Sequence, residues 1–168
     1  ECLDPLEAAK RIVQHKLRPL DIAKVDANGE TFYAFNIIGW GLATDAGKLA
    51  EKLRLFGGMR YDIASVIEVL KGKDRFAKLK IENEVIDDNF IFVIGCNTIH
   101  TGKAMKMAPI AKLDDGKIDL LIVRKTSRVN LLKLFPKLFS GDHIKSPLVE
   151  YRQVANFSIY VEESNDLT

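Results

Sequence analysis

The stretch FNIIGWGLATDAGKLAEKLRLFGGMRY, residues 35–61, holds the glycines, charges and apolar spacing that decide the fold of this chain. The glycines of Gly39-Trp40-Gly41 let a backbone leave a strand and approach another group closely, so this tripeptide is expected to break a strand. A helix over about Asp45–Phe56 is predicted next, with Thr44 or Asp45 as its N-cap and Gly57-Gly58 as its stop.

Strands are predicted on both sides of this stretch. Before it, two strands flank the turn residues Asn28-Gly29, which tolerate positive φ. After it, the apolar period changes to two beyond Arg75, and Pro136 should kink or shorten a late helix. The predicted helices cover Glu7–Lys16, Tyr61–Leu70 and Val129–Phe139, and the predicted strands cover Leu20–Val25, Glu30–Ile38, Phe76–Glu82, Phe90–Cys96, Ile118–Lys125 and one bent or two short strands in Val149–Glu162. Strands joined by Asn-Gly and Asp-Gly turns, with helices inserted, predict a mainly β, α+β fold with an antiparallel sheet or sandwich.

Length and composition predict one soluble globular domain spanning residues 1–168. The chain is 47% hydrophobic and 29% charged, which excludes disorder, collagen-like repetition and a disulfide scaffold. A net charge of +2 argues against a nucleic-acid partner. The cysteines Cys2 and Cys96 cannot form a Cys₄ zinc site and fit a reduced, intracellular protein. The sequence contains no apolar run long enough to span a membrane and no signal peptide, and its start at Glu1 fits an excerpt of a longer protein.

Charged residues follow the Gly-Trp-Gly tripeptide at intervals of three, which places them on adjoining positions of one helix face: Asp45, Lys48, Glu51 and Arg54. One interpretation is an ordinary exposed ion pair between Glu51 and Arg54. The other uses Arg60, beyond the glycine turn, because two arginines flanking a helix end can converge on an anion such as a phosphate.

A second informative stretch is GKAMKMAPIAKLDDGKIDL, residues 102–120. Asp115-Gly116 has the chemistry of a hairpin turn, and most such turns have no further role. An Asp carboxylate with neighbouring carbonyls can also hold Mg²⁺ or Ca²⁺. The three histidines show no metal-ligand spacing, and no serine lies in the context of a hydrolase nucleophile.

Together these stretches resemble the C-terminal half of the diacylglycerol kinase catalytic domain, as found in sphingosine, ceramide and acylglycerol kinases and in bacterial lipid kinases. The resemblance covers about four-fifths of the chain and is closest to the sphingosine and ceramide kinase branch. Its motifs are Arg18-Pro19-Leu20-Asp21, Asn36-x-x-Gly39-Trp40-Gly41, Asp45, Glu51-Lys52, Arg54, Gly57, Arg60-Tyr61, Gly102-x-x-Met105, Pro109-x-Ala111, Asp115-Gly116 and Asp119-Leu120.

The resemblance implies an ATP-dependent lipid kinase of two domains, with ATP and Mg²⁺ as cofactors, that acts on a lipid at a membrane surface. This chain would be its lipid-binding β-sandwich half. The Gly-Gly-Asp-Gly-Thr loop of the nucleotide-binding domain, which supplies the catalytic Asp, is absent from these residues, so the chain alone is expected to be inactive. A cytoplasmic, peripherally membrane-associated protein is expected. The alternative is a non-catalytic lipid-binding module.

The resemblance also implies roles for individual residues. Arg54 and Arg60 would contact nucleotide phosphates, and Asp45 and Glu51 would lie beside the lipid head group. The substrate would be a sphingoid base or a related lipid, namely ceramide, acylglycerol or diacylglycerol. Gly47 stands where sphingosine kinases carry a second Asp, which argues against sphingosine and leaves the related lipids. A structural Mg²⁺ would bind Asp115 with carbonyls near Lys112 and Lys117. Candidates to line the lipid pocket, which core packing would also explain, are Trp40, Leu42, Phe56, Met59, Ile63 and Met105.

Overall fold

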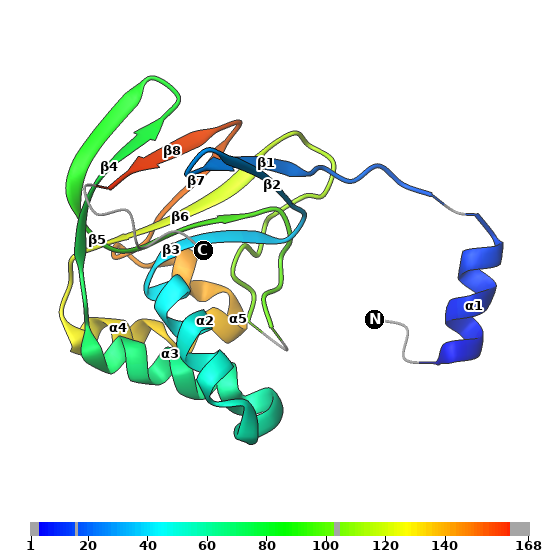
Figure 1. Ribbon diagram of the computed structural model, residues 1–168, viewed down its shortest axis with the longest axis horizontal. Helices are drawn as coiled ribbons and strands as arrows, with labels where there is room; N and C mark the ends of the chain where they lie inside the picture. The colour runs from blue at the N-terminus through cyan, green and yellow to red at the C-terminus, as the bar shows by residue number, and fades with distance from the viewer. Residues whose placement is uncertain (1–3, 16, 103–104, 162–168) are drawn as a thin grey trace.

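A six-stranded antiparallel sheet is built around one long strand, β5 (Glu84–Cys96), in the computed structural model (Figure 1). The structure describes residues 4–15, 17–102 and 105–161. Along one edge of β5, β4 (Arg75–Ile81) and β3 (Ile37–Gly41) pair end to end, and β6 (Ile118–Arg124) pairs along the other edge. The outer strands are β7 (Glu150–Val154) on β6 and β8 (Phe157–Tyr160) on β4.

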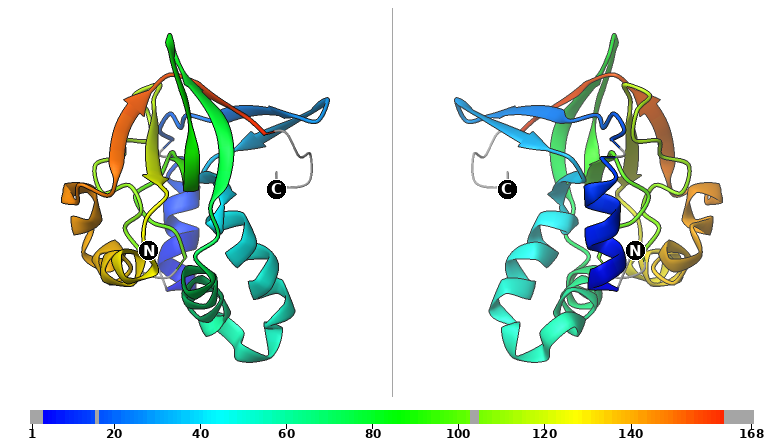
Figure 2. Two further views of the ribbon diagram at one scale, coloured as in Figure 1. Left: turned by 90° about the vertical axis from the view of Figure 1, so that its left-hand side faces the viewer. Right: turned by 90° about the vertical axis from the view of Figure 1, so that its right-hand side faces the viewer.

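Helices cover one face of this sheet (Figures 1 and 2). A separate hairpin of β1 (Ala23–Ala27) and β2 (Glu30–Ala34) lies beyond the other face. No helix among the described residues is long and apolar enough to cross a membrane. The helical segments are α1 (Pro5–Val13), which stands apart from the sheet, α2 (Leu42–Lys52), η1 (Arg54–Met59), α3 (Arg60–Lys71), α4 (Arg128–Leu134), α5 (Lys137–Ser140) and η2 (Asp142–Lys145).

The core has two parts, one on each face of the sheet, because side chains alternate between the faces of a strand. Ile94 and Cys96 of β5 pack with Leu121 and Val123 of β6 beneath the helices. Phe90 and Val93 pack on the opposite face with residues of β3, β4 and β6. The predicted α+β fold with antiparallel strands is confirmed.

Several local predictions are also confirmed. Asn28 and Gly29, with φ of 53° and 81°, form the turn between β1 and β2. The predicted late helix is interrupted at Pro136 into α4 and α5, and the C-terminal segment forms two short strands, β7 and β8.

The prediction that Gly39-Trp40-Gly41 breaks a strand is wrong. These residues belong to β3 and pair with Ile94, Val93 and Phe92 of β5. Helix α2 follows directly, with Gly41 rather than Thr44 or Asp45 as its N-cap, and it ends at Lys52. The reason is the conformation of Gly41, whose φ of 82° turns the chain from strand to helix within one residue.

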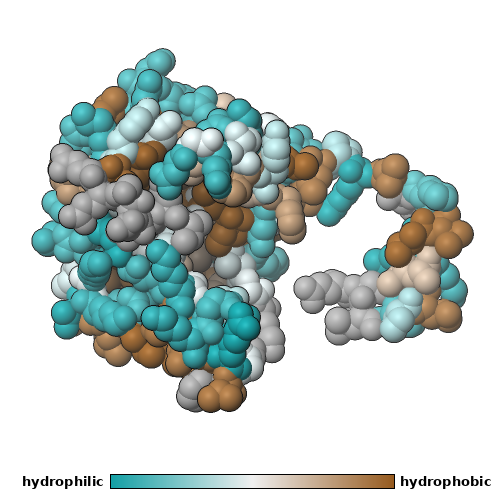
Figure 3. All heavy atoms as spheres, in the orientation of Figure 1, coloured by the Kyte–Doolittle hydropathy of each residue, from teal (hydrophilic) through white to brown (hydrophobic). Residues whose placement is uncertain are grey.

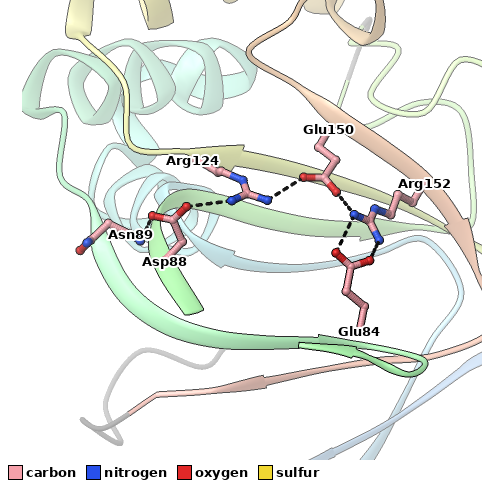
Figure 4. A network of polar contacts seen from close by, with 6 residues as sticks. All are labelled: Glu84, Asp88, Asn89, Arg124, Glu150 and Arg152. Carbon is pink, nitrogen blue, oxygen red and sulfur yellow. Dashed lines mark hydrogen bonds and ion pairs between the residues drawn. The ribbon is translucent and has the colours of Figure 1, made fainter. Parts of the chain in front are cut away.

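A network of alternating charges joins β5, β6 and β7 (Figure 4). Arg124 of β6 donates to Asp88 of β5 at 2.9 Å and to Glu150 of β7 at 3.1 Å. Arg152 of β7 bonds Glu150 and also Glu84, and its hydrogen bond lowers the pKa of the Glu84 carboxyl. A single exposed ion pair contributes little to the stability of a protein. A network that spans three strands, however, holds those strands together in one register.

Gly41 is expected to tolerate no side chain. A Cβ at this position would lie 2.5 Å from the carbonyl oxygen of Ile91, a main-chain atom of the central strand. We expect Gly41→Ala to lower the free energy of unfolding by more than about 3 kcal/mol, because steric overlap adds to backbone strain.

Gly29→Ala is the matched control. Gly29 has nearly the same φ, 81°, but nothing lies within 4 Å of its Cβ position, so only backbone strain of about 1–2 kcal/mol is expected. Urea unfolding of both variants measures the difference, and equal losses would refute the close contact at Gly41.

Candidate functional site

An apolar cavity of about 480 Å³ lies between the sheet and the helices. Strands β3 and β5 form its floor, α2, α3 and α4 form its walls, and two methionines of the β5–β6 connection close it. Its lining residues are Ile37, Leu42, Ala43, Ala46, Gly47, Tyr61, Ser65, Val69, Phe92, Ile94, Thr101, Gly102, Met105, Met107, Leu131, Leu134, Phe135 and Leu138. Because almost all of these side chains are apolar, the cavity suits a hydrocarbon group.

A more polar groove of about 390 Å³ adjoins the cavity along α2. Ile37, Ala43 and Gly47 line both hollows, so the cavity and the groove meet over small side chains. A Cβ at Gly47 would have no atom within 4 Å, which shows open space at this junction. The groove continues past Lys48 to Glu51. An elongated molecule can therefore place an apolar part in the cavity and a polar part beside Glu51.

Glu51 is the meeting point of both predicted arginines. Arg54 bonds its Oε2 at 2.6 Å, and the Arg60 guanidinium lies 3.5 Å from its Oε1 and 4.9 Å from the Tyr61 ring centroid. The Tyr61 hydroxyl donates to the same Oε1 at 3.5 Å. The hydrogen bond and charge of Arg54, with the charge of Arg60, hold the pKa of the Glu51 carboxyl below its usual range.

Each of the two interpretations of these charges, an exposed ion pair and a convergence of two arginines, describes part of the observed cluster. Glu51 and Arg54 form an exposed ion pair, and Arg60 converges on the same carboxylate from beyond the η1 turn. Two guanidinium groups that share one carboxylate can exchange it for the oxygens of a phosphate, which accept the same forked hydrogen bonds. The cluster is thus chemically able to bind a phosphorylated ligand.

Asp45 lies apart from this cluster. Its two carboxylate oxygens accept from Nη2 of Arg75 at 3.0 and 2.9 Å, and this pair, mostly buried, ties α2 to β4. Asp45 does not line either the cavity or the groove. The expectation of one shared face fails here because each step of three residues rotates about 300° around a helix, so residues 45 and 51 point about 120° apart.

The predicted pocket residues do not share one pocket. Leu42 and Met105 line the cavity, whereas Trp40, 1% exposed, packs on the opposite face of the sheet. Met59 is 66% exposed, and neither Met59 nor Ile63 lines the cavity. The Phe56 side chain lies outside the described part of the chain. Trp40 is separated from Leu42 because Gly41, with φ of 82°, turns the chain between them from β3 into α2.

The residues of α4 and α5 that line the cavity were missed by sequence reasoning. Leu131, Leu134 and Leu138, with Phe135 at the C-cap of α4, recur at helical spacing, which is typical of an apolar helix face but does not show what that face covers. Only the fold brings this face to the cavity, since it lies far from α2 in the sequence.

The Asp115 turn remains a predicted metal site. The N–H of Lys117 donates to Asp115 Oδ1 at 3.1 Å, and Asp21 reaches the same turn, where its Oδ2 accepts from the N–H of Gly116 at 2.7 Å. Two carboxylates with adjacent main-chain carbonyls, such as those of Lys112 and Lys117, are an oxygen-only donor set of the kind that Mg²⁺ accepts. Within residues 4–15, 17–102 and 105–161, no group of three or more His, Cys, Asp or Glu side chains could hold a metal.

Comparison with known proteins places this arrangement in a family. The chain is 24% identical to sphingosine kinase 1 of Arabidopsis thaliana, over 87% of this chain and 38% of that protein. It is also 24% identical to diacylglycerol kinase of Bacillus subtilis, over 98% of this chain and 54% of that protein. The crystal structure of a diacylglycerol kinase from Bacillus anthracis superposes with a TM-score of 0.67 at 25% identity, covering 94% of this chain and 50% of that one.

The chain thus spans about half or less of the length of these relatives, all of which are named as lipid kinases. Residues 36–167 match the family described as the YegS C-terminal NAD kinase beta sandwich-like domain. Since this match covers most of the chain, the protein belongs to the YegS C-terminal domain family and is homologous to diacylglycerol and sphingosine kinases.

Proposed function

We propose that this chain is the substrate-binding half of an ATP-dependent lipid kinase, which transfers the γ-phosphate of ATP to a lipid hydroxyl. The observation that carries the proposal is the continuity of the apolar cavity, the groove at Gly47 and the arginine cluster at Glu51. The kinase names of the relatives support it, as does the length by which they exceed this chain. The nucleotide-binding domain and the catalytic base would lie outside the described residues.

The acyl or alkyl chain of the lipid would occupy the cavity. A volume of about 480 Å³ lies within the range of roughly 300–1,000 Å³ typical of ligand sites. Burial of a hydrocarbon chain there contributes about 0.8 kcal/mol per CH₂ group, so the cavity would supply most of the binding free energy. Such a protein would work at a cytoplasmic membrane surface, from which it takes its substrate.

The head group would lie in the groove beside Gly47, Lys48 and Glu51. Glu51 is the one acidic side chain that lines the groove within the described part of the chain, and Arg54 and Arg60 already neutralise it. Asp45 is engaged by Arg75. This balance favours a neutral head group, as in ceramide, acylglycerol or diacylglycerol, over the ammonium group of a sphingoid base.

Arg54 and Arg60 would bind the phosphates of the nucleotide. Phosphoryl transfer is catalysed mostly by positioning and by neutralising charge, and forked guanidinium groups do both. ATP would supply the phosphoryl group together with Mg²⁺. Glu51 pairs with both arginines, which would position them before the nucleotide binds.

We expect Gly47→Leu to weaken lipid binding at least 10-fold without loss of stability. The added side chain has room at Cβ and fills the junction between cavity and groove. Lys52→Leu adds the same side chain to an exposed position of α2 and should leave the affinity unchanged. Titration with a fluorescent monoacylglycerol, alongside thermal melting, measures both. Equal affinity in the two variants would rule out the cavity as the lipid site.

We expect Arg54→Ala and Arg60→Ala to lower kcat/KM of the full-length protein about 10²–10³-fold while lipid binding persists, because each removes positive charge from the site of phosphoryl transfer. Arg11→Ala is the control, since Arg11 also forms an exposed pair with a glutamate, Glu7, but on the remote helix α1. The assay measures phosphate transfer from labelled ATP to ceramide, monoacylglycerol, diacylglycerol and sphingosine.

Unchanged turnover in both variants would remove Arg54 and Arg60 from the phosphate site. Lipid binding with no phosphorylation of any lipid in the panel would favour the alternative, a non-catalytic lipid-binding module.

A further inference from the structure

A second hollow, of about 630 Å³, lies on the face of the sheet that the helices leave open. One wall is the consecutive run Asp21–Ala27, and the other is the consecutive run Ala155–Tyr160. Trp40, Val93 and Asn97 contribute to its floor. Among the described residues, none from β2 or β4, the partners of these two walls, lines the hollow. The hollow therefore runs along the free edges of β1 and β8 rather than over their faces.

The free edge of β1 presents main-chain groups that β2 does not bond. Ala27 and Glu30 flank the two-residue turn, so they form a hydrogen-bonded pair, and bonded pairs alternate with non-bonded pairs along an antiparallel ladder. Lys24 and Asp26 are then the residues whose N–H and C=O groups point away from β2.

The same reasoning applies to β8. Ile81 and Glu84 flank the turn between β4 and β5, so alternate residues of β4 bond to β5 and the others bond to β8. Ser158 and Tyr160 are the residues of β8 that bond to β4. Phe157 and Ile159 therefore direct their main-chain groups toward the opposite edge, which lines the hollow.

Two buried polar atoms of the floor residues also lack hydrogen-bond partners within the described part of the chain. These are Nε1 of Trp40, a donor, and Oδ1 of Asn97, an acceptor, in side chains 1% and 4% exposed. Buried polar groups are nearly always hydrogen-bonded in proteins, so this donor and this acceptor leave hydrogen-bonding capacity at the floor of the hollow. A peptide main chain offers both kinds of group.

The hairpin of β1 and β2 needs a further partner for its own stability. A two-stranded hairpin is marginal in water, and this one pairs with no other strand among the described residues. It projects beyond the sheet in Figure 2. Tyr33, 72% exposed, and its neighbours Phe32 and Phe35 leave apolar surface on the hairpin uncovered.

We propose that the hollow accepts one further extended strand, which pairs with β1 on one side and β8 on the other and joins the hairpin to the main sheet. The two open edges face one hollow, which is the geometry that strand addition requires. Alternate side chains of this strand would be apolar and pack over Trp40 and Val93, within the apolar cluster of that face.

The same polypeptide is the source that we assign to this strand. The relatives carry about as much chain again as the part that this protein matches, so a strand supplied in cis is available in proteins of this family. The proposal does not depend on the kinase reaction, and its test uses no substrate.

Hydrogen exchange at single-residue resolution in the full-length protein tests the pairing directly. The outward amides of β2, those of Thr31 and Tyr33, are the internal control because they occupy the other edge of the same hairpin. We expect the amides of Lys24, Asp26, Phe157 and Ile159 to exchange on the order of 100-fold more slowly than these controls. Equal exchange at the two edges would overturn the proposal.

A pair of proline variants gives a second test. Lys24 and Tyr33 are directly opposite each other, and neither N–H bonds within the hairpin. Lys24→Pro removes an N–H that would bond the added strand, whereas Tyr33→Pro removes one that faces solvent. Relative to Lys24→Ala and Tyr33→Ala, we expect Lys24→Pro to lower Tm by several degrees more than Tyr33→Pro.

Similar losses of Tm in the two proline variants would contradict an added strand. Slow exchange that appears only at high concentration, with a dimeric mass by light scattering, would assign the strand to a second copy and overturn its origin in cis.

Discussion

The close approach of Gly41 to the main chain of Ile91 is the contact on which the site depends. It lets β3 pair with the central strand up to its last residue and then turn at once into α2. Thr44 secures this first turn, where its hydroxyl donates to the carbonyl of Gly39 at 3.1 Å. The position of α2 in turn decides which of its residues face the groove and which face β4. A longer connection would not place Gly47 at the junction of cavity and groove, or Glu51 in the groove.

The sequence predicts local structure where a residue's own backbone preference decides the conformation. Asn28-Gly29 specifies a turn by its tolerance of positive φ, and Pro136 interrupts a helix because it lacks an N–H and clashes with the preceding turn. The strand break predicted at Gly39-Trp40-Gly41 is wrong because it rests on the average preference of glycine, which is unfavourable in strands. Here its lack of a side chain is what allows close pairing, and the partner that makes this favourable, β5, lies far away in the sequence.

The sequence likewise predicts only part of the candidate site. The convergence of Arg54 and Arg60 follows from their positions on either side of a glycine turn, and the structure places both at Glu51. The partner of Asp45 did not follow, because Arg75 comes from a different element. The wall that α4 contributes to the cavity is likewise a product of tertiary packing. By our two proposals, the faces of the sheet take different partners: the apolar chain of a lipid under the helices and a further strand on the other side.

The central claim is that the cavity under the helices holds the hydrocarbon chain of a lipid. Figure 3 shows hydrophobic residues interspersed with hydrophilic ones on the face that it presents. Photo-crosslinking with a monoacylglycerol that carries a diazirine at the end of its acyl chain, followed by peptide mass spectrometry, tests the central claim most directly. We predict that the label attaches to Met107 and to the α4 residues Leu131 and Leu134, which line the cavity but not the groove. Labelling of Trp40 or β8 instead, on the opposite face of the sheet, would contradict the account.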